Sequence, residues 1–256
     1  YINVYDFALL VNSEIGIPTT ADKYGIKTVK MPLKVYYCRP DYNLRLIQEF
    51  ADIVVETSTM PREAWVNCRM FTSIVKGFHS FGILLFVASY LHQKSKVDYK
   101  EFYNHLYTWM MGQKAFQVYS DLKMWYTEIS IGNQIDNPAI EYYDGVRVPP
   151  EEATFLRVIE NIDTLYYELR PFLIQYLDDR SPCEADLLRF QEYVFRSIYR
   201  EDTINSQEEF RYDFVSFFDR IAVGEEAVLE EKPIMIDLDK VNELLLYPKR
   251  VYVSES

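Results

Sequence analysis

The chain has 256 residues, of which 49% are hydrophobic and 26% charged, so an intrinsically disordered chain is excluded. Its formal net charge of −12 argues against nucleic acid and anionic membrane surfaces as main partners, because both require a basic face. The 22 tyrosines and 16 phenylalanines suit either wet clefts and interfaces or, more simply, a tyrosine-rich edge of the core.

The first eleven residues, from Tyr1 to Val11, are a nearly continuous run of apolar and strand-forming residues. Such a run predicts a strand that is covered on both faces and needs neighbours on both sides. The residues that follow, Asn12–Gly16 and Pro18–Thr20, have turn chemistry and supply no neighbouring strand. We therefore expect a chain that was cut from a longer protein, inside a sheet whose other strands are missing.

The next segments alternate between strand and helix patterns. Gly25 suits the end of a short helix, and Ile26–Pro32 predicts an edge strand that stops at proline. Asn43–Phe50 predicts a short amphipathic helix, and Asp52–Glu56 predicts a short strand. This order is typical of the fringe of an α/β sheet.

The segment Thr57–Glu63 marks the clearest boundary, since proline suits the first turn of a helix and glutamate complements its N-terminal dipole. A single helix is predicted from Arg62 to His92. Its second half is apolar all round and should lie at the centre of the fold. The longest apolar stretch, Phe81–Ala88, falls short of the roughly 20 residues that a membrane span requires.

Capping signals and apolar spacing predict a mainly helical remainder. The predicted helices run from Asp98 to Met110, from Lys114 to Glu128, from Pro149 to Leu177 with a kink at Pro171, from Ser181 to Tyr199, and for one or two turns at Val215–Ile221. The predicted strands are a hairpin at Asp144-Gly145 and a small terminal sheet from Glu208–Phe214, Pro233–Asp237 and Arg250–Val253. The expected fold class is α+β and predominantly helical.

The residues offer little catalytic chemistry of their own. Three histidines, His79, His92 and His105, lie thirteen residues apart, which on a helix turns each about 140° from the last and gives no ligand stripe. His79 is the most site-like, because it is polar within an apolar surround. The alternative is a core histidine bonded to a neighbouring carbonyl. No nucleophile elbow, phosphate-binding glycine loop or zinc motif occurs.

The three cysteines, Cys38, Cys68 and Cys183, are odd in number and widely spaced. They give neither a disulfide framework nor metal-ligand spacing, so a reducing, cytoplasmic setting is expected. No secretory or transit segment is visible. By default the chain is a module without its own catalytic constellation.

Three sets of segments, in this order, resemble parts of the cobalamin-binding radical S-adenosylmethionine enzymes. Leu9–Glu14 followed by Asp22–Val29 resembles the exit from their radical domain. Val55–Trp65 leading to Gly77–Phe81 resembles the first helix of their C-terminal extension. Val148–Ala153, with Asn161 and Pro171–Leu173, resembles a later helical segment. The resemblance covers most of the chain.

The resemblance implies a parent protein with a cobalamin-binding domain, a partial barrel that holds an iron–sulfur cluster and S-adenosylmethionine, and then this region. Residues 1–56 would be the tail of the barrel and residues 57–256 a mainly helical domain with a small sheet. The family's Cys-x-x-x-Cys-x-x-Cys loop is absent here. Cluster and cofactors are therefore expected on the missing upstream domains, which are the expected partners. This region would act as a cap that shields the substrate and would be inactive alone.

The residues expected to face substrate or cofactor are Asn12, Glu14, Thr57, Thr59, Trp65 and His79. Asn12 and Glu14 follow the supposed barrel strand, where barrel loops meet ligands, although Asn12 alternatively makes an Asx turn. Thr57 and Thr59 alternatively cap a helix, and Trp65 alternatively belongs to the core. The reaction subtype stays open between methylation, cyclisation and rearrangement.

Two other classes of function compete with this one. A helical protein-interaction module predicts an exposed apolar patch of more than a few hundred Å². A free-standing hydrolase predicts a pocket that brings His79 within hydrogen-bond reach of a carboxylate and a hydroxyl.

Overall fold

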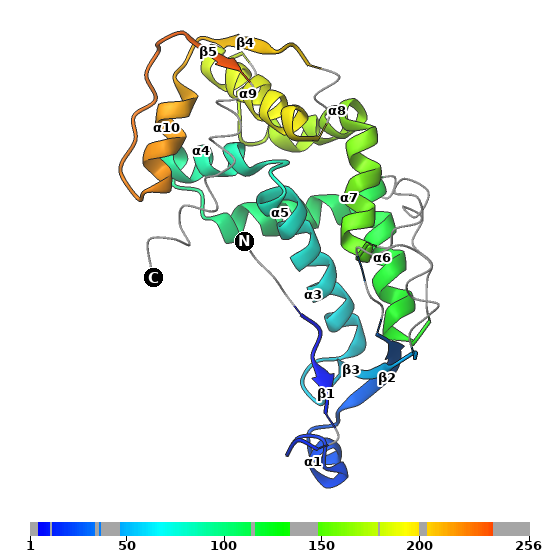
Figure 1. Ribbon diagram of the computed structural model, residues 1–256. Coiled ribbons are helices and arrows are strands. Elements are labelled where there is room, and N and C mark those ends of the chain that lie inside the picture. Colours follow the sequence, from blue (N-terminus) through cyan, green and yellow to red (C-terminus); the bar gives the residue numbers. More distant parts are fainter. Residues whose placement is uncertain are drawn as a thin grey trace. The chain divides into compact units, whose positions relative to one another are not determined.

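The computed structural model describes residues 5–10, 12–33, 36, 47–113, 116–133, 148–178, 180–199 and 204–237. Within them the chain is a mixed α+β protein, mostly helical with small antiparallel sheets, which confirms the predicted fold class (Figure 1). It divides into two compact units. We call the unit of Ile2–Ile74 and Met110–Glu160 the sheet unit, and the unit of Tyr1, Val75–Trp109 and Asn161–Ser256 the helical unit. The boundary predicted between residues 56 and 57 stays a prediction.

A three-stranded antiparallel sheet defines the sheet unit. Its order is β1-β3-β2, with β1 at Ala8–Leu9, β2 at Lys27–Pro32 and β3 at Phe50–Glu56. The central strand β3 buries two neighbouring valines, Val54 and Val55, as its apolar sequence demands. The edge position predicted for residues 26–32 is confirmed, and Pro32 is tolerated because it ends an edge strand.

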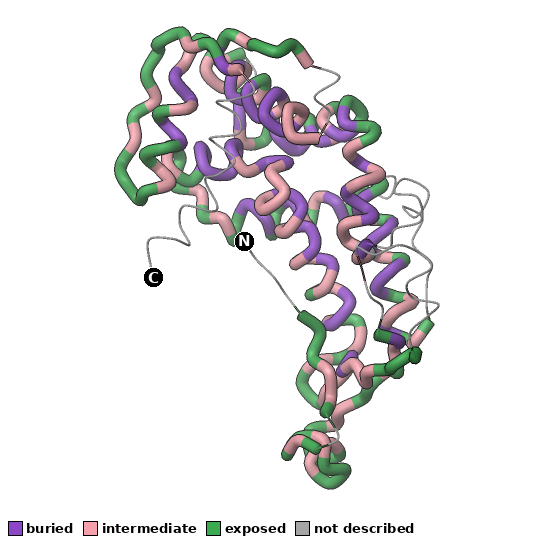
Figure 2. The backbone as a smooth tube through the Cα atoms, in the orientation of Figure 1, coloured by how far each residue is buried: buried purple, intermediate pink, exposed green. Residues whose placement is uncertain are grey.

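The opening strand is shorter and more exposed than its sequence predicts. Tyr5 is 83% exposed, Phe7 53% and Leu10 62%, and Figure 2 draws this part of the chain largely as exposed. β1 pairs with β3 and forms an edge of the sheet within the described residues. The predicted burial on both faces requires neighbouring strands that were expected in the rest of a longer protein, so for residues 5–10 it stays a prediction. The side chains of this segment favour a strand, but burial depends on what packs against them.

The helices of the sheet unit are α1 at Pro18–Lys23, most of α3 at Arg62–Val75, α6 at Gln117–Ser130 and α7 at Pro150–Glu160. Gly25 follows α1 with φ +59°, the left-handed conformation that the sequence predicted for a helix end. The buried Asp121 of α6 accepts a 2.8 Å hydrogen bond from Nη1 of Arg157 on α7, which joins these two helices.

The long helix predicted from Arg62 to His92 is broken. α3 ends at Val75, a π-helical turn follows at Lys76–Ser80, and α4 begins at Leu85. Gly82 has φ +92°, which a continuing helix does not allow, so the break falls where the sequence offers glycine. Among the described residues no single helix is long and apolar enough to cross a membrane. Only the two parts of this broken helix, taken together, have that length and composition.

The helical unit contains α4 at Leu85–Ser95, most of α5 at Tyr99–Gly112, α8 at Ile162–Leu173, α9 at Pro182–Tyr199, β4 at Gln207–Phe210, α10 at Phe214–Ala222 and β5 at Ile234–Asp237. Its core is aromatic: Phe190 of α9 stacks on Phe218 of α10 at 5.7 Å and meets Phe86 of α4 edge-on at 5.0 Å. The many phenylalanines are thus core residues here. β4 and β5 pair antiparallel, which confirms a small sheet in this part of the chain. The strand predicted at 208–214 is too long, because β4 ends at Phe210 and Phe214 begins α10.

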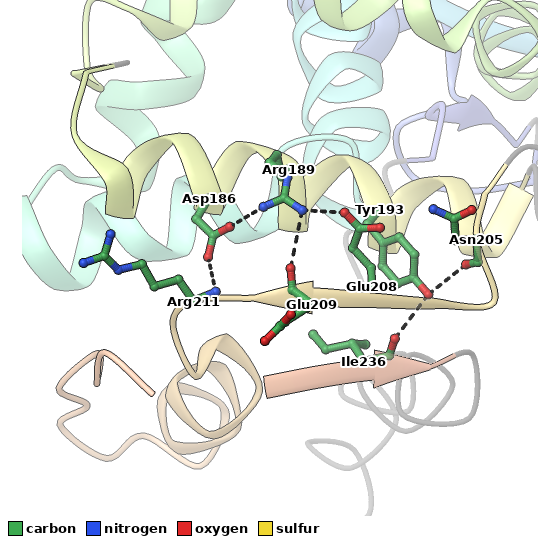
Figure 3. Close-up of polar contacts among 8 residues, drawn as sticks. All are labelled: Asp186, Arg189, Tyr193, Asn205, Glu208, Glu209, Arg211 and Ile236. Atoms are coloured by element: carbon green, nitrogen blue, oxygen red, sulfur yellow. Dashed lines mark hydrogen bonds and ion pairs between the residues drawn. The ribbon is translucent and has the colours of Figure 1, made fainter. Parts of the chain in front are cut away.

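Polar contacts attach β4 and β5 to α9 (Figure 3). The buried Asp186 accepts hydrogen bonds from Arg189 Nη1 and from the backbone N–H of Arg211, both at 2.8 Å. Tyr193 Oη donates to the carbonyls of Asn205 and Ile236, at 3.2 and 3.4 Å, so one phenol contacts the chain before β4 and the paired strand β5 at the same end of the small sheet.

The remaining element predictions have mixed outcomes. The helices predicted at 98–110, 114–128 and 181–199 are present as α5, α6 and α9. The helix predicted at 43–50 is wrong for residues 47–50, because Phe50 already begins β3. The helix predicted at 149–177 breaks at Asn161 instead of Pro171, which lies in the last turn of α8. The hairpin at residues 144–145 and the strand at 250–253 lie outside the described residues.

Candidate functional site

The loop after β1 carries the first two candidate residues. Asn12 and Glu14 are both exposed. The turn around them is closed by Ser13, whose backbone N–H and hydroxyl donate to the Leu10 carbonyl at 3.0 and 2.6 Å. The turn hydrogen bonds between described residues thus come from Ser13, one residue after the predicted Asx position. Asn12 and Glu14 are left on the surface, where they are available to a ligand.

Thr57 and Thr59 lie in the turn that leads from β3 into α3. Their hydroxyl oxygens are 3.5 Å apart, and Thr57 Oγ1 accepts a 3.1 Å hydrogen bond from the backbone N–H of Met60. Thr57 therefore shapes the entry to α3, in line with the capping alternative. The turn is fixed to the end of α1, since the Ser58 N–H donates to the Tyr24 carbonyl at 2.9 Å.

Trp65 on α3 is buried, with 6% of its surface exposed, and meets the ring of Tyr126 edge-on at 6.2 Å. The core alternative for Trp65 is therefore the one that the structure supports. Its neighbour Tyr126 is itself hydrogen-bonded to Ser73 at 2.7 Å.

A partly buried ion pair in the sheet unit escaped the sequence analysis. Arg69 of α3 pairs with Asp6 at 3.1 Å through Nε and lies over the ring of Tyr126 at 5.1 Å. Burial raises the pKa of Asp6, and the positive charge of Arg69 opposes that rise. Since Asp6 lies just before β1, the pair fastens the start of that strand to α3. Nothing in the sequence spacing signals it, because its members are separated by more than sixty residues.

His79 belongs to the other unit and lies in the π-helical turn Lys76–Ser80. Its Nδ1 is 3.0 Å from the hydroxyl of Tyr103, and the rings of Tyr99 and Tyr103 meet it edge-on at 5.5 and 5.6 Å. Burial lowers the pKa of His79 and raises that of Tyr103 well above its usual value. At neutral pH the phenol therefore stays protonated and the imidazole neutral, so the hydrogen bond joins two uncharged groups.

The π-helical turn has further features of a specialised segment. π-Helical turns are rare and often occur at functional sites. Beside His79, the buried hydroxyl of Ser80 has no hydrogen-bond partner among the described residues. The predicted carbonyl partner of His79 is a phenol instead. Within the described part of the chain His79 has a hydroxyl but no carboxylate at hydrogen-bond distance, so the hydrolase alternative gains no support.

The structure thus brings together some of the candidate residues and separates others. Thr57 and Thr59 are neighbours in one turn, with Trp65 buried behind it in the same unit. His79 lies in the other unit, the helical one.

Metal and cluster ligands do not gather in this chain. In the ranges that the structure describes, no three side chains of histidine, cysteine, aspartate or glutamate come together to hold an ion. Cys68 is an exposed free thiol on α3 and Cys183 a partly buried one on α9, in different units, while Cys38 lies outside the described residues. The described residues therefore do not fit an iron–sulfur cluster, which needs several thiolates at one place.

Comparisons with known proteins give the chain its relatives. A cobalamin-dependent radical SAM methyltransferase, TokK from Streptomyces tokunonensis, is 25% identical over 239 residues, or 85% of this chain. The chain is a distant homologue of cobalamin-dependent radical S-adenosylmethionine methyltransferases. The 2-(S-pantetheinyl)-carbapenam-3-carboxylate methyltransferase of Streptantibioticus cattleyicolor is 26% identical over 256 residues, or 93% of the chain.

The alignments cover most of this chain but only part of each relative. The chain spans only 34% and 36% of the lengths of these two methyltransferases, about a third of each. No family model matches the chain. The resemblance that the sequence predicted is thereby confirmed at the level of distant homology to the methyltransferases.

Proposed function

We propose that this chain is the C-terminal portion of a cobalamin-dependent radical S-adenosylmethionine methyltransferase, in which it covers the reaction site and keeps water away from the substrate. The observation that carries the proposal is the homology, which takes in 85% and 93% of this chain but about a third of each relative. Both relatives are methyltransferases by name, which favours methylation over cyclisation or rearrangement as the reaction.

The cofactors are assigned to the rest of the parent polypeptide. The described residues provide no set of metal ligands, and the cysteine loop of the family is absent from the sequence. Bound there, the cluster, S-adenosylmethionine and cobalamin would supply the radical chemistry and carry the methyl group. This chain would contribute orientation and the exclusion of water.

The described residues suit a shielding role in two ways. In the helical unit, aromatic rings fill the core, and the His79–Tyr103 pair is held uncharged at neutral pH because burial opposes ionisation of both groups. In the sheet unit, the exposed Asn12 and Glu14 offer polar contacts in the loop after β1. We propose that these two residues face the substrate, while Thr57 and Trp65 support the loop and helix behind them.

The test uses the natural gene, since its open reading frame would encode the upstream domains. The full polypeptide, prepared without oxygen, should bind cobalamin, show the absorbance of an iron–sulfur cluster, and cleave S-adenosylmethionine reductively. Methyl-labelled S-adenosylmethionine should pass its label to cobalamin. The 256-residue chain alone should do none of these.

Two results would overturn the proposal. One is a cluster and reductive cleavage of S-adenosylmethionine by the 256-residue chain alone. The other is a natural polypeptide that binds neither cobalamin nor a cluster. The second result would favour the competing class, a helical interaction module, which the exposed apolar residues near β1 also suit.

A further inference from the structure

The exposed apolar side chains of the protein are concentrated at the sheet. More than half of the large apolar side chains that are exposed in the described chain lie between residues 5 and 50, although most described residues come later. Five of them surround β1 and the ends of β2 and β3. This N-terminal apolar surface consists of Tyr5, Phe7, Leu10, Leu33 and Phe50, which are between 49% and 83% exposed.

Hydrogen bonds and register place these residues close to one another along the sheet. The Phe7 carbonyl accepts from the Val54 N–H at 2.9 Å, and Leu9 lies opposite Asp52. Because side chains alternate along a strand, this register puts Phe7 and Phe50 on one face of the sheet and Leu10 on the other face, beside the same edge. The N–H of Leu33 donates to the Glu49 carbonyl at 2.8 Å, directly beside Phe50.

The two edges of this sheet differ in how they resist a further strand. β2 carries Lys27 and Lys30, ends at Pro32, and has an irregular register between Lys27 and Thr28, all of which discourage pairing. β1 has none of these features from Phe7 to Leu10. The pairing of Phe7 and Leu9 with β3 leaves the N–H and C=O of Ala8 pointing to the open edge of the described sheet.

We propose that the open edge of β1 and the N-terminal apolar surface bind a strand from another part of the same polypeptide, outside these 256 residues. The inference rests on the proposed function. The relatives are about three times as long as the aligned region, which leaves ample chain to supply the strand. An added strand would pair with Ala8 and bury Phe7 and Leu10, and this is how extended segments join an exposed sheet edge.

Hydrogen exchange tests the pairing directly. The backbone amides of residues 5–10 should exchange at least about tenfold more slowly in the full natural polypeptide than in the 256-residue chain, because the added strand withdraws them from solvent. Peptides from α10, remote in sequence, serve as the internal reference. Equal exchange of residues 5–10 in both proteins would overturn the proposal, as would a natural gene that encodes no further polypeptide.

A pair of double variants tests the surface. Phe7→Gln with Phe50→Gln should leave the melting temperature of the 256-residue chain within about 2 °C, because surface changes are usually small. In the full polypeptide it should abolish the protection of residues 5–10. The control is Met111→Gln with Met124→Gln, in the same unit and 46% and 47% exposed, which should leave that protection intact. Protection that survives the Phe7 and Phe50 changes would contradict the proposal.

Other occupants give different results. If the 256-residue chain forms dimers in sedimentation and the double variant makes it monomeric, a second copy is the occupant and the proposal is wrong. Binding of the chain to neutral phosphatidylcholine vesicles, lost in the double variant, would likewise assign the surface to a membrane. Protection in a polypeptide without cobalamin or cluster would refute the proposed function while leaving the strand addition in place.

Discussion

Single buried polar residues set several features of this protein, and Gln191 is the clearest. It is fully buried on α9, where Oε1 accepts from the Phe86 N–H at 2.9 Å and Nε2 donates to the Gly82 carbonyl at 2.7 Å. One side chain thus satisfies backbone groups on both sides of the break before α4. A glutamine in an amphipathic helix gives no sign of this role in the sequence.

Replacing Gln191 with leucine should lower the free energy of unfolding by about 2–4 kcal/mol, because two buried backbone groups lose their partners. Urea denaturation followed by circular dichroism measures the change. The matched control is Gln175→Leu, whose exposed side chain only reaches the Pro171 carbonyl and whose loss should cost less than about 0.5 kcal/mol. Equal effects of the two changes would refute the role of Gln191.

The ionisation of His79 makes stability depend on pH. Burial lowers its pKa below the ordinary 6.5, so below that pH the unfolded chain binds more protons at this residue than the folded one. Stability from the neutral imidazole is therefore present above pH 6.5 and is lost as pH falls toward the lowered folded pKa. Relative to a His79→Gln variant, the wild type should therefore lose stability as pH falls from 7.5 to 5. If the free energies of unfolding of the two proteins change in parallel with pH, the prediction for His79 is wrong.

Asp213 makes stability depend on pH through a group that stabilises the fold when it is charged. Burial raises its pKa, but hydrogen bonds from Ser216 N and Oγ, both at 3.0 Å, and the charge of Lys232 lower it more, so the pKa lies below the ordinary 3.8. Its stabilisation is present above pH 3.8 and is lost as pH falls through the folded pKa. Because Asp213 caps α10, Asp213→Ala should cost about 1 kcal/mol at pH 7, and Asp213→Asn less. Thermal unfolding at pH 7 ranks the variants, and a larger loss for asparagine than for alanine would exclude the capping role.

Among the elements, the small sheet of β4 and β5 depends on α9 through Asp186. Asp186→Ala removes the acceptor of the Arg211 N–H and one partner of Arg189, with an expected loss of about 2–3 kcal/mol. Hydrogen exchange should rise in residues 207–210 and 234–237. As a control, Glu225→Ala breaks the exposed Arg220 pair and should leave both segments unchanged. Protection that persists in the Asp186 variant would show that the sheet is held without Asp186, by its other contacts with α9.

Local signals in the sequence were enough for most of the elements. Proline at the start and apolar spacing predicted α9, and Gly25 marked the end of α1, because capping and side-chain periodicity are local properties. The break after Val75 was missed because Gly77 and Gly82 are tolerated in many helices. At Gly82 the broken conformation is supported by the hydrogen bond from Gln191, which joins residues more than a hundred positions apart.

At the scale of the whole molecule, the candidate site was the least predictable part. For Thr57 and Trp65 the structure supports the turn and core alternatives, which their immediate neighbours in the sequence suggested, while contact with a substrate stays a prediction. The partners of His79 and the Asp6–Arg69 pair depend on the tertiary fold. The homology, in turn, was recognisable because segment order survives even at 25% identity.

The path of the chain through its two units bears on how it unfolds. The chain passes between them within α3, within α5 and between α7 and α8. The last turn of α5, Met110–Gly112, belongs to the sheet unit, but its helical hydrogen bonds depend on the preceding turn in the helical unit. We therefore expect one cooperative transition, although the chain exceeds the usual size of two-state domains.

Tryptophan fluorescence can test this cooperativity, because Trp65 and Trp125 lie in the sheet unit and Trp109 in the helical unit. In a Trp109→Phe background, fluorescence reports on the sheet unit alone. Gln191→Leu, which acts in the helical unit, should then lower the urea midpoint measured by fluorescence as much as the midpoint measured by circular dichroism. Both shifts should correspond to a loss of about 2–4 kcal/mol in the free energy of unfolding. A fluorescence midpoint that does not move would mean that the sheet unit unfolds independently, and Gln175→Leu should shift neither signal.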